Sequence, residues 1–204
     1  MEHDSKSDER DDAKLRQLTT QAKQELRARM RAVRRVLPAD ARAQRSSRAV
    51  ARIAELPEFE RAHTIVAYSA LQKELDPAAL LTHANALGKR IGLPRVQGDQ
   101  LYLHVVRPGD PLEEGDFGTL EPRPDAPLIA ADEVDFIVVP ALALDAEGYR
   151  LGYGQAFYDR LLPTLNHAFR VGVVYDFQVL AELPRHPHDV PVQCVVSDGR
   201  TLRM

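Results

Sequence analysis

Strands and helices alternate along this sequence, which predicts an α/β fold with a layered, largely parallel sheet flanked by helices. Four short apolar runs rich in valine, isoleucine and leucine indicate buried strands at 64–68, 90–94, 135–139 and 170–174. The segments between several of them have helical spacing, and a basic helix precedes them all. We therefore expect ligands to bind beyond the carboxyl ends of the strands, as they do in open parallel sheets.

The predicted N-terminal helix has apolar residues at spacings of three and four before Pro38. These residues are Leu15, Leu18, Ala22, Leu26, Met30, Val33 and Leu37. Lys23, Arg27 and Arg31 step by four along the same helix and therefore share one face. A basic stripe of this kind is either a solvated face or a binding surface for an anion.

Charge is distributed unevenly along the chain, whose net charge is -3. Residues 1–12 carry six acids and two bases, and we expect them to form a disordered leader before a single domain at 13–204. Residues 13–36 carry eight bases and one acid. The basic segment favours an anionic ligand, with a nucleic acid as one alternative.

The remaining elements are expected as follows. Helices are predicted at 39–56, at 76–88, at 155–165 and near 177–182, and strands at 101–106 and 192–196, with a turn into a short terminal strand. Asp76 is the expected N-cap of the second of these helices, Pro77 its first-turn proline and Gly88 its stop. Residues 107–131 are rich in Pro, Gly and acids and are predicted to form a long loop.

A glycine turn after the strand at 135–139 has the chemistry of an anion site. Gly152 and Gly154 let the backbone approach an anion closely, and a helix beginning after them would offer free N–H groups. Arg150 can donate to phosphate, and Asp159 can bind a divalent cation. The common nucleotide-binding fingerprints are absent, so a plain tight turn is the alternative interpretation.

Four ordered stretches together resemble the 5-formyltetrahydrofolate cyclo-ligase family. The longest runs from Val139 to Arg160 and includes the glycine turn. The others are 23–27, similar to an N-terminal K-x-x-L-R, 72–76, and 188–191, which reads H-D-V-P. The resemblance covers residues 14–197.

The resemblance implies an enzyme that uses ATP to cyclise 5-formyltetrahydrofolate to 5,10-methenyltetrahydrofolate, releasing ADP and phosphate. It implies that ATP is bound by Lys23, Arg27, Arg150, Leu151, Gly152, Tyr153, Gly154, Gln155, Ala156, Phe157, Tyr158 and Asp159. Lys23 and Arg150 would be catalytic through charge neutralisation, and Asp159 would bind Mg²⁺. Glu74 would orient the pterin with Ser69 nearby, since a carboxylate can accept two hydrogen bonds from a pterin edge.

Two residues depart from the family pattern. Many members have Gly or Lys at the position of Gln155 and Gly at that of Ala156. We predict that Ala156 lies inside the helix with φ near -60°, where alanine is favourable. If the position requires φ > 0 instead, ATP binding would suffer.

Bulk properties exclude several classes of protein. Cys194 is the single cysteine, which excludes an internal disulfide and a thiolate zinc cluster. We expect a cytoplasmic protein, because the N-terminus is polar and no apolar run is long enough to span a bilayer.

Two alternatives to the enzyme stay open: a folate- and ATP-binding paralogue with little turnover, and a nucleic-acid-binding module using the basic helix. The acidic body disfavours the second. The roles of Glu121 and Asp189, polyglutamate preference and oligomeric state are not determined by the sequence.

Overall fold

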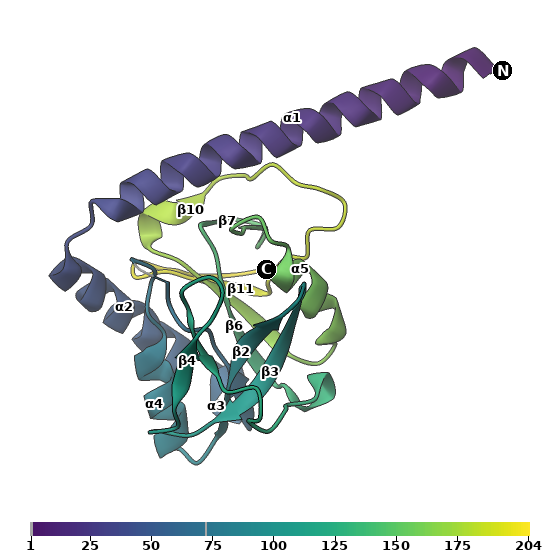
Figure 1. Cartoon of the computed structure of the whole chain (residues 1–204). Coiled ribbons are helices and arrows are strands. Elements are labelled where there is room, and N and C mark those ends of the chain that lie inside the picture. The colour runs from purple at the N-terminus through teal and green to yellow at the C-terminus, as the bar shows by residue number, and fades with distance from the viewer. Residues whose placement is uncertain (1, 72) are drawn as a thin grey trace.

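A twisted sheet of mostly parallel strands forms the centre of the molecule (Figure 1). The computed structural model describes residues 2–71 and 73–204, so Met1 and Gln72 lie outside the described residues. The strands of the central sheet are β1 (Thr64–Val66), β2 (Arg90–Gln97), β3 (Gln100–Val106), β6 (Phe136–Pro140), β9 (Phe169–Val173), β11 (Cys194–Val196) and β12 (Thr201–Arg203). Their order is β12-β11-β9-β6-β1-β2-β3, and only β3 and β12, at the two edges, pair antiparallel with their neighbours. The predicted α/β fold is confirmed.

Helices cover both faces of this sheet. α2 (Ala39–Ala54), α3 (Pro57–Arg61) and α4 (Ala78–Ala86) pack on one face, while α5 (Phe157–Leu161) and the 3₁₀ turn η2 (Leu162–Thr164) pack on the other. Along β6, Phe136 and Val138 belong to the first core and Ile137 and Val139 to the second. Burial on both faces explains why the strand is a continuous apolar run.

The order of strands in the sheet changes direction at β1, which lies between β2 and β6. From β1 it passes through α4 to β2 on one side, and it later reaches β6 on the other side. The segments that leave the carboxyl ends of β1 and β6 therefore diverge and leave a crevice between them. Ligands bind at such switch points in open α/β sheets.

The N-terminal helix α1 (Glu2–Arg35) is 34 residues long. Met30 is buried in a third small core with Leu142, Leu151 and other residues, and Leu26 packs against it. Leu15, Leu18 and Val33 are exposed, so the predicted apolar face is only partly used. Figure 1 shows the reason for the first two: the N-terminal half of α1 extends past the body of the molecule.

Helix α1 also includes residues 2–12, where the sequence predicts a disordered leader. The first 37 residues have neither proline nor glycine, so no residue there would interrupt a helix. The division into a leader and a domain at 13–204 stays a prediction.

A second sheet escaped the sequence analysis. It consists of β7 (Ala143–Asp145), β8 (Arg150–Leu151) and β10 (Val179–Leu180), in the order β10-β7-β8. The buried carboxylate of Asp145 closes the β7–β8 hairpin by accepting hydrogen bonds from the amides of Glu147 and Tyr149. This hairpin presents Arg150 to the crevice.

Three other expectations need correction. The segment 107–131 is not a plain loop: it contains the hairpin of β4 (Leu112–Glu114) and β5 (Leu120–Pro122), and η1 (Ala131–Glu133) follows it. The helix predicted near 177–182 is the 3₁₀ turn η3 (Asp176–Gln178) followed by β10.

Pro77, not Asp76, occupies the N-cap of α4, although Asp76 Oδ1 still accepts a hydrogen bond from the amide of Ala78 at 2.9 Å.

Candidate active site

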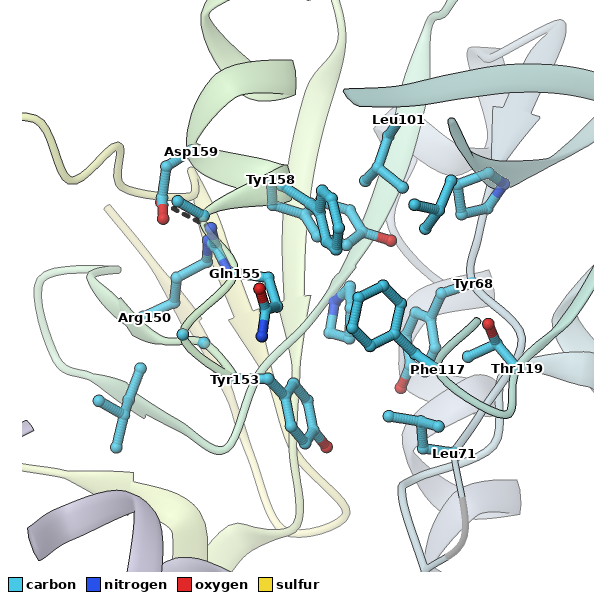
Figure 2. A pocket seen from close by; sticks show the side chains of 18 of the residues that line it. Tyr68, Leu71, Leu101, Phe117, Thr119, Arg150, Tyr153, Gln155, Tyr158 and Asp159 are labelled. Carbon is cyan, nitrogen blue, oxygen red and sulfur yellow. Dashed lines mark hydrogen bonds and ion pairs between the residues drawn. The ribbon is translucent and has the colours of Figure 1, made fainter. Parts of the chain in front are cut away.

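A cavity of about 440 Å³ opens at the crevice between β1 and β6. Its walls come from seven parts of the chain: α1, the β1–α4 loop, the β2–β3 hairpin, the β4–β5 hairpin, the end of β6, the turn 150–159 and the C-terminal segment 186–189. Figure 2 shows the ion pair of Arg150 and Asp159 on one side of this cavity, Tyr68 and Phe117 on the opposite side, and Gln155 between them. One side is cationic and the other is aromatic.

Arg150 and Asp159 form the centre of the cationic side. Arg150 Nη2 donates to Asp159 Oδ1 at 2.6 Å, and the Arg150 guanidinium lies 5.5 Å from the centre of the Tyr158 ring. The Arg150 side chain is only 5% exposed, and its Nε has no hydrogen-bond partner among the described atoms. A buried guanidinium with an unused N–H donor is suited to bind an anion.

Helix α1 adds two further cations to this side. Arg27 Nε donates to the carbonyl oxygen of Gly152 at 2.9 Å, which ties the helix to the glycine turn. Lys23 Nζ lies 2.5 Å from Asp189 Oδ2. Lys23 and Arg27 therefore line the cavity as the sequence predicts, whereas Arg31, on the same stripe, is exposed at its rim.

Glu74 is the buried carboxylate of the opposite side. Its Oε2 accepts a hydrogen bond from the amide of Leu71 at 2.8 Å, and its Oε1 accepts one from the hydroxyl of Tyr153. Arg34 Nη1 lies 3.6 Å from Oε1. Burial raises the pKa of Glu74, and the Tyr153 hydroxyl, the Arg34 charge and the Leu71 amide only partly offset this shift.

Hydrogen bonds from two buried tyrosines fix the backbone around Glu74. The hydroxyl of Tyr175 donates to the carbonyl of Glu74 at 2.8 Å, and that of Tyr68 donates to the carbonyl of Leu75 at 2.6 Å. The amide of Asp76 donates to Ser46 Oγ at 3.1 Å. The carboxylate is thus held on a rigid loop, which is what precise binding requires.

The backbone at Ala156 contradicts the sequence prediction. Ala156 is the N-cap of α5 and has φ 56° and ψ 16°, in the left-handed region, and Gly154 before it has φ 107°. The helix predicted at 155–165 begins at Phe157 and lasts five residues before η2. Alanine stands in a conformation that favours glycine, because its Cβ approaches the neighbouring carbonyl there.

The other predicted site residues lie in or beside the cavity. Ser69, Gln155, Phe157 and Tyr158 line it, and Arg160 Nη2 donates to the Gln155 carbonyl at 2.9 Å. Leu151 also touches the cavity but is 1% exposed and belongs to the core beneath α1. The ATP-binding roles of Leu151, Gln155, Phe157 and Tyr158 stay predictions, as does the folate-binding role of Ser69.

Several residues of the site were missed by the sequence analysis. Arg34 is one, although its position seven residues after Arg27 places it on the same face of α1. Phe117 is another: it stacks edge-on against Phe157 with ring centroids 5.4 Å apart, and no sequence signal announces it. Glu121, left without a role, lines the cavity and accepts hydrogen bonds from Thr119 and from the amide of Val96.

A metal site is not preformed in the part of the chain that the structure describes. There, no three His, Cys, Asp or Glu side chains are grouped to hold an ion. Mg²⁺ nevertheless often binds through one or two carboxylates together with water and substrate phosphates. Asp159, next to the buried Arg150, fits that mode.

These features define a class: an α/β protein with a cavity at the switch point of its sheet, lined on one side by cations. Within the described ranges, no helix combines the length and apolarity that a membrane span needs.

Comparisons with known proteins identify the family. A model of the 5-formyltetrahydrofolate cyclo-ligase family matches residues 19–198. The chain is 38% identical over 148 residues to the 5-formyltetrahydrofolate cyclo-ligase of Mycolicibacterium smegmatis, covering 67% of this chain and 74% of that protein. It is 30% identical over 181 residues to the enzyme of that name from Haemophilus influenzae, covering 86% and 97%. The NMR structure of 5,10-methenyltetrahydrofolate synthetase from Aquifex aeolicus superimposes with a TM-score of 0.80 at 35% identity, covering 89% of this chain and 92% of that one. The chain belongs to the 5-formyltetrahydrofolate cyclo-ligase family and is an enzyme of that family.

Proposed function

We propose that this enzyme uses ATP to convert 5-formyltetrahydrofolate to 5,10-methenyltetrahydrofolate, with release of ADP and phosphate. One observation carries the proposal: Glu74 and the cations Lys23, Arg27 and Arg150 line a single cavity. The carboxylate side suits a pterin edge, and the cationic side suits phosphates. The reacting ends of the two substrates would then meet between them.

The chemistry requires activation of the formyl oxygen, which is a poor leaving group. Transfer of the γ-phosphoryl group to this oxygen forms an imidate-like phosphate and ADP. The second folate nitrogen then attacks the formyl carbon and releases its proton to solvent, and the C–O bond breaks as phosphate departs. The positive charge that remains is delocalised over the two nitrogens of the product.

The enzyme's contribution to these steps is positioning and neutralisation of charge. Lys23, Arg27 and Arg150 would hold the phosphates, and the amides of the turn around Gly152 and Gly154 would add neutral donors. Glu74 would orient the pterin. Mg²⁺ held by Asp159 would neutralise further phosphate charge. A strong general base is not needed.

A direct assay tests the proposal. The product has an extended chromophore that 5-formyltetrahydrofolate lacks, so turnover is followed by absorbance after mixing enzyme, substrate, ATP and Mg²⁺. We expect an ATP-dependent rise in absorbance. If the rate does not exceed that of a protein-free control, the proposal is wrong.

The burial of α1 cations weakens the nucleic-acid alternative only in part. Lys23 and Arg34 are each 6% exposed, and Lys23 lines the cavity. Arg16, Arg29 and Arg31 on the same helix are exposed. Exposed cations can reach phosphates along a strand, so polynucleotide binding measured at increasing salt tests this alternative.

A further inference from the structure

Tyr153 connects the two sides of the cavity. It belongs to the glycine turn, between Gly152 and Gly154, yet its hydroxyl donates a hydrogen bond to Glu74 of the β1–α4 loop. The two residues are separated by 79 positions in the sequence. The turn proposed to bind phosphate is therefore tethered to the carboxylate proposed to bind the pterin.

Side chains of helix α1 pack against this contact between Tyr153 and Glu74. The guanidinium groups of Arg31 and Arg34 lie 5.8 Å and 5.6 Å from the centre of the Tyr153 ring. Arg34 also lies 3.6 Å from Glu74 Oε1, and Arg27 donates to the Gly152 carbonyl at 2.9 Å. Arg31 and Arg34 thus pack against the ring of Tyr153, and Arg27 contacts the backbone of its turn.

A ligand that reaches the Glu74 carboxylate must displace a neighbouring group, because the Glu74 side chain is only 4% exposed. One carboxylate oxygen accepts from Tyr153 and the other from the amide of Leu71. The Leu71 bond is local, since it joins residues only three positions apart. The Tyr153 bond joins separate segments and is the one that a ligand can replace without unfolding the loop.

We infer that Tyr153 is a positioning residue that couples the two substrate sites. A folate that engages Glu74 releases Tyr153, and the released turn then closes its amides around the nucleotide phosphates. Folate and nucleotide consequently strengthen each other's binding by the same factor, as linkage requires. The inference rests on the proposed function, because it takes a reduced folate as the ligand of Glu74.

The test is a binding cycle without turnover. Calorimetry measures the Kd of the non-hydrolysable β,γ-imido analogue of ATP, with Mg²⁺, in the absence and presence of saturating 5-formyltetrahydrofolate. For the wild-type enzyme we expect the folate to tighten nucleotide binding by about fivefold or more, the lower bound of typical couplings. In Tyr153→Phe the factor falls below about twofold, and the folate-free affinity for the nucleotide rises, because the tether to Glu74 is gone.

Tyr149→Phe is the matched control. Tyr149 lies in the β7–β8 hairpin outside the cavity, with its ring 4.1 Å from the Arg185 guanidinium, so removing its hydroxyl leaves the coupling factor unchanged. Tyr153→Leu, which removes the ring as well, should abolish coupling as Tyr153→Phe does. Thermal unfolding confirms that each variant is folded.

The outcomes separate the two proposals. Equal coupling in the wild type and Tyr153→Phe, or independent binding of the two ligands in the wild type, overturns the role of Tyr153 and leaves the proposed function standing. If the wild-type enzyme does not bind 5-formyltetrahydrofolate at all, the proposed function is wrong and the coupling falls with it.

Discussion

Lys23 Nζ lies 2.5 Å from Asp189 Oδ2, although the two residues are 166 positions apart. The side chains are 8% and 10% exposed, and the amide of His186 also donates to the same carboxylate oxygen at 2.7 Å. Burial would raise the pKa of Asp189, but the Lys23 ammonium and the His186 amide outweigh it and hold the pKa below its ordinary value. The pair joins α1 to the C-terminal segment at the edge of the cavity.

Removing one charge of this pair should lower the free energy of unfolding more than removing both charges does. Lys23→Met leaves the Asp189 carboxylate buried without its partner, and such changes cost about 3 kcal/mol or more. Lys23→Met/Asp189→Asn removes the stranded charge, so we expect it to recover at least about 1 kcal/mol of the loss. Urea denaturation of the three proteins measures these free energies of unfolding.

Arg16→Met is the control for this comparison. Arg16 is exposed on the same helix, and its loss should change the free energy of unfolding by less than about 0.5 kcal/mol. A double variant no more stable than Lys23→Met would show that the Lys23–Asp189 pair does not act as a unit.

Asp159→Asn tests the proposed metal ligand while retaining an oxygen that can accept from Arg150. We expect turnover to fall by about a hundredfold or more, the range for losing a group that stabilises transition-state charge. In the wild type, Mg²⁺ should tighten binding of the β,γ-imido ATP analogue, and in Asp159→Asn this effect should largely disappear. Affinity for 5-formyltetrahydrofolate should not change. Persistence of the full Mg²⁺ effect in the variant would exclude Asp159 as the metal ligand.

The raised pKa of Glu74 makes both the stability of the protein and its proposed folate binding depend on pH. Burial raises this pKa, so the carboxyl takes up a proton at a higher pH than the ordinary 4.5. The folded state then binds this proton more tightly than the unfolded state. Its contribution to stability is therefore present below pH 4.5 and is lost as the pH rises through the raised pKa.

The protonated carboxyl also loses one of its acceptors, so affinity for 5-formyltetrahydrofolate should fall as the pH drops through the raised pKa. Tyr153→Phe removes a donor to the charged form and should move the midpoint further upward. Titrations between pH 4.5 and 8 measure both effects. Glu74→Gln should bind more weakly at neutral pH and lack the step, and an unchanged step in that variant would assign it to another group.

The sequence predicts the central strands because they are buried on both faces, and this makes them continuous apolar runs. β8 is only two residues long and shows no periodicity, so the hairpin that presents Arg150 could not be predicted. The stepping of Lys23 and Arg27 predicts a shared face, since helical geometry is local. The contacts Lys23–Asp189 and Tyr153–Glu74 join distant segments, and no local pattern reports them.

The backbone conformation of Ala156 is another feature that a local sequence pattern does not predict. Glycine at 154 signals a positive φ, but alanine at 156 carries no such signal, and the helical composition that follows favours an earlier helix start. The left-handed geometry arises because the chain must turn between Gly154 and the first residue of α5. A single-residue conformation of this kind is determined by the surrounding fold.

Ala156→Gly should therefore stabilise the enzyme, contrary to what a helical position would predict. Left-handed φ/ψ costs a non-glycine residue about 1–2 kcal/mol, while glycine adds about 0.4–1 kcal/mol of unfolded-state entropy. The net gain of up to about 1.6 kcal/mol corresponds to a rise in Tm of up to about 3–6 °C for a chain of this size. Calorimetric melting of the variant and the wild type measures it.

The control is Ala51→Gly, at an exposed position inside α2, where φ is helical. Glycine there should cost about 1 kcal/mol, so the Tm should move in the opposite direction. If both variants lower the Tm, position 156 does not have the left-handed conformation in solution.

Steady-state kinetics of Ala156→Gly measure how the alanine at position 156 affects catalysis. Ala156 lines the cavity at the end of the glycine turn, so strain at this residue acts on the backbone that is proposed to hold the phosphates. Relief of that strain should lower the KM for ATP by less than about thirtyfold, because about 2 kcal/mol is the most it can release. A gain in kcat/KM of a hundredfold or more would exceed this strain. It would mean that the methyl group of Ala156 obstructs the nucleotide, and that this chain is a weakened relative within its family.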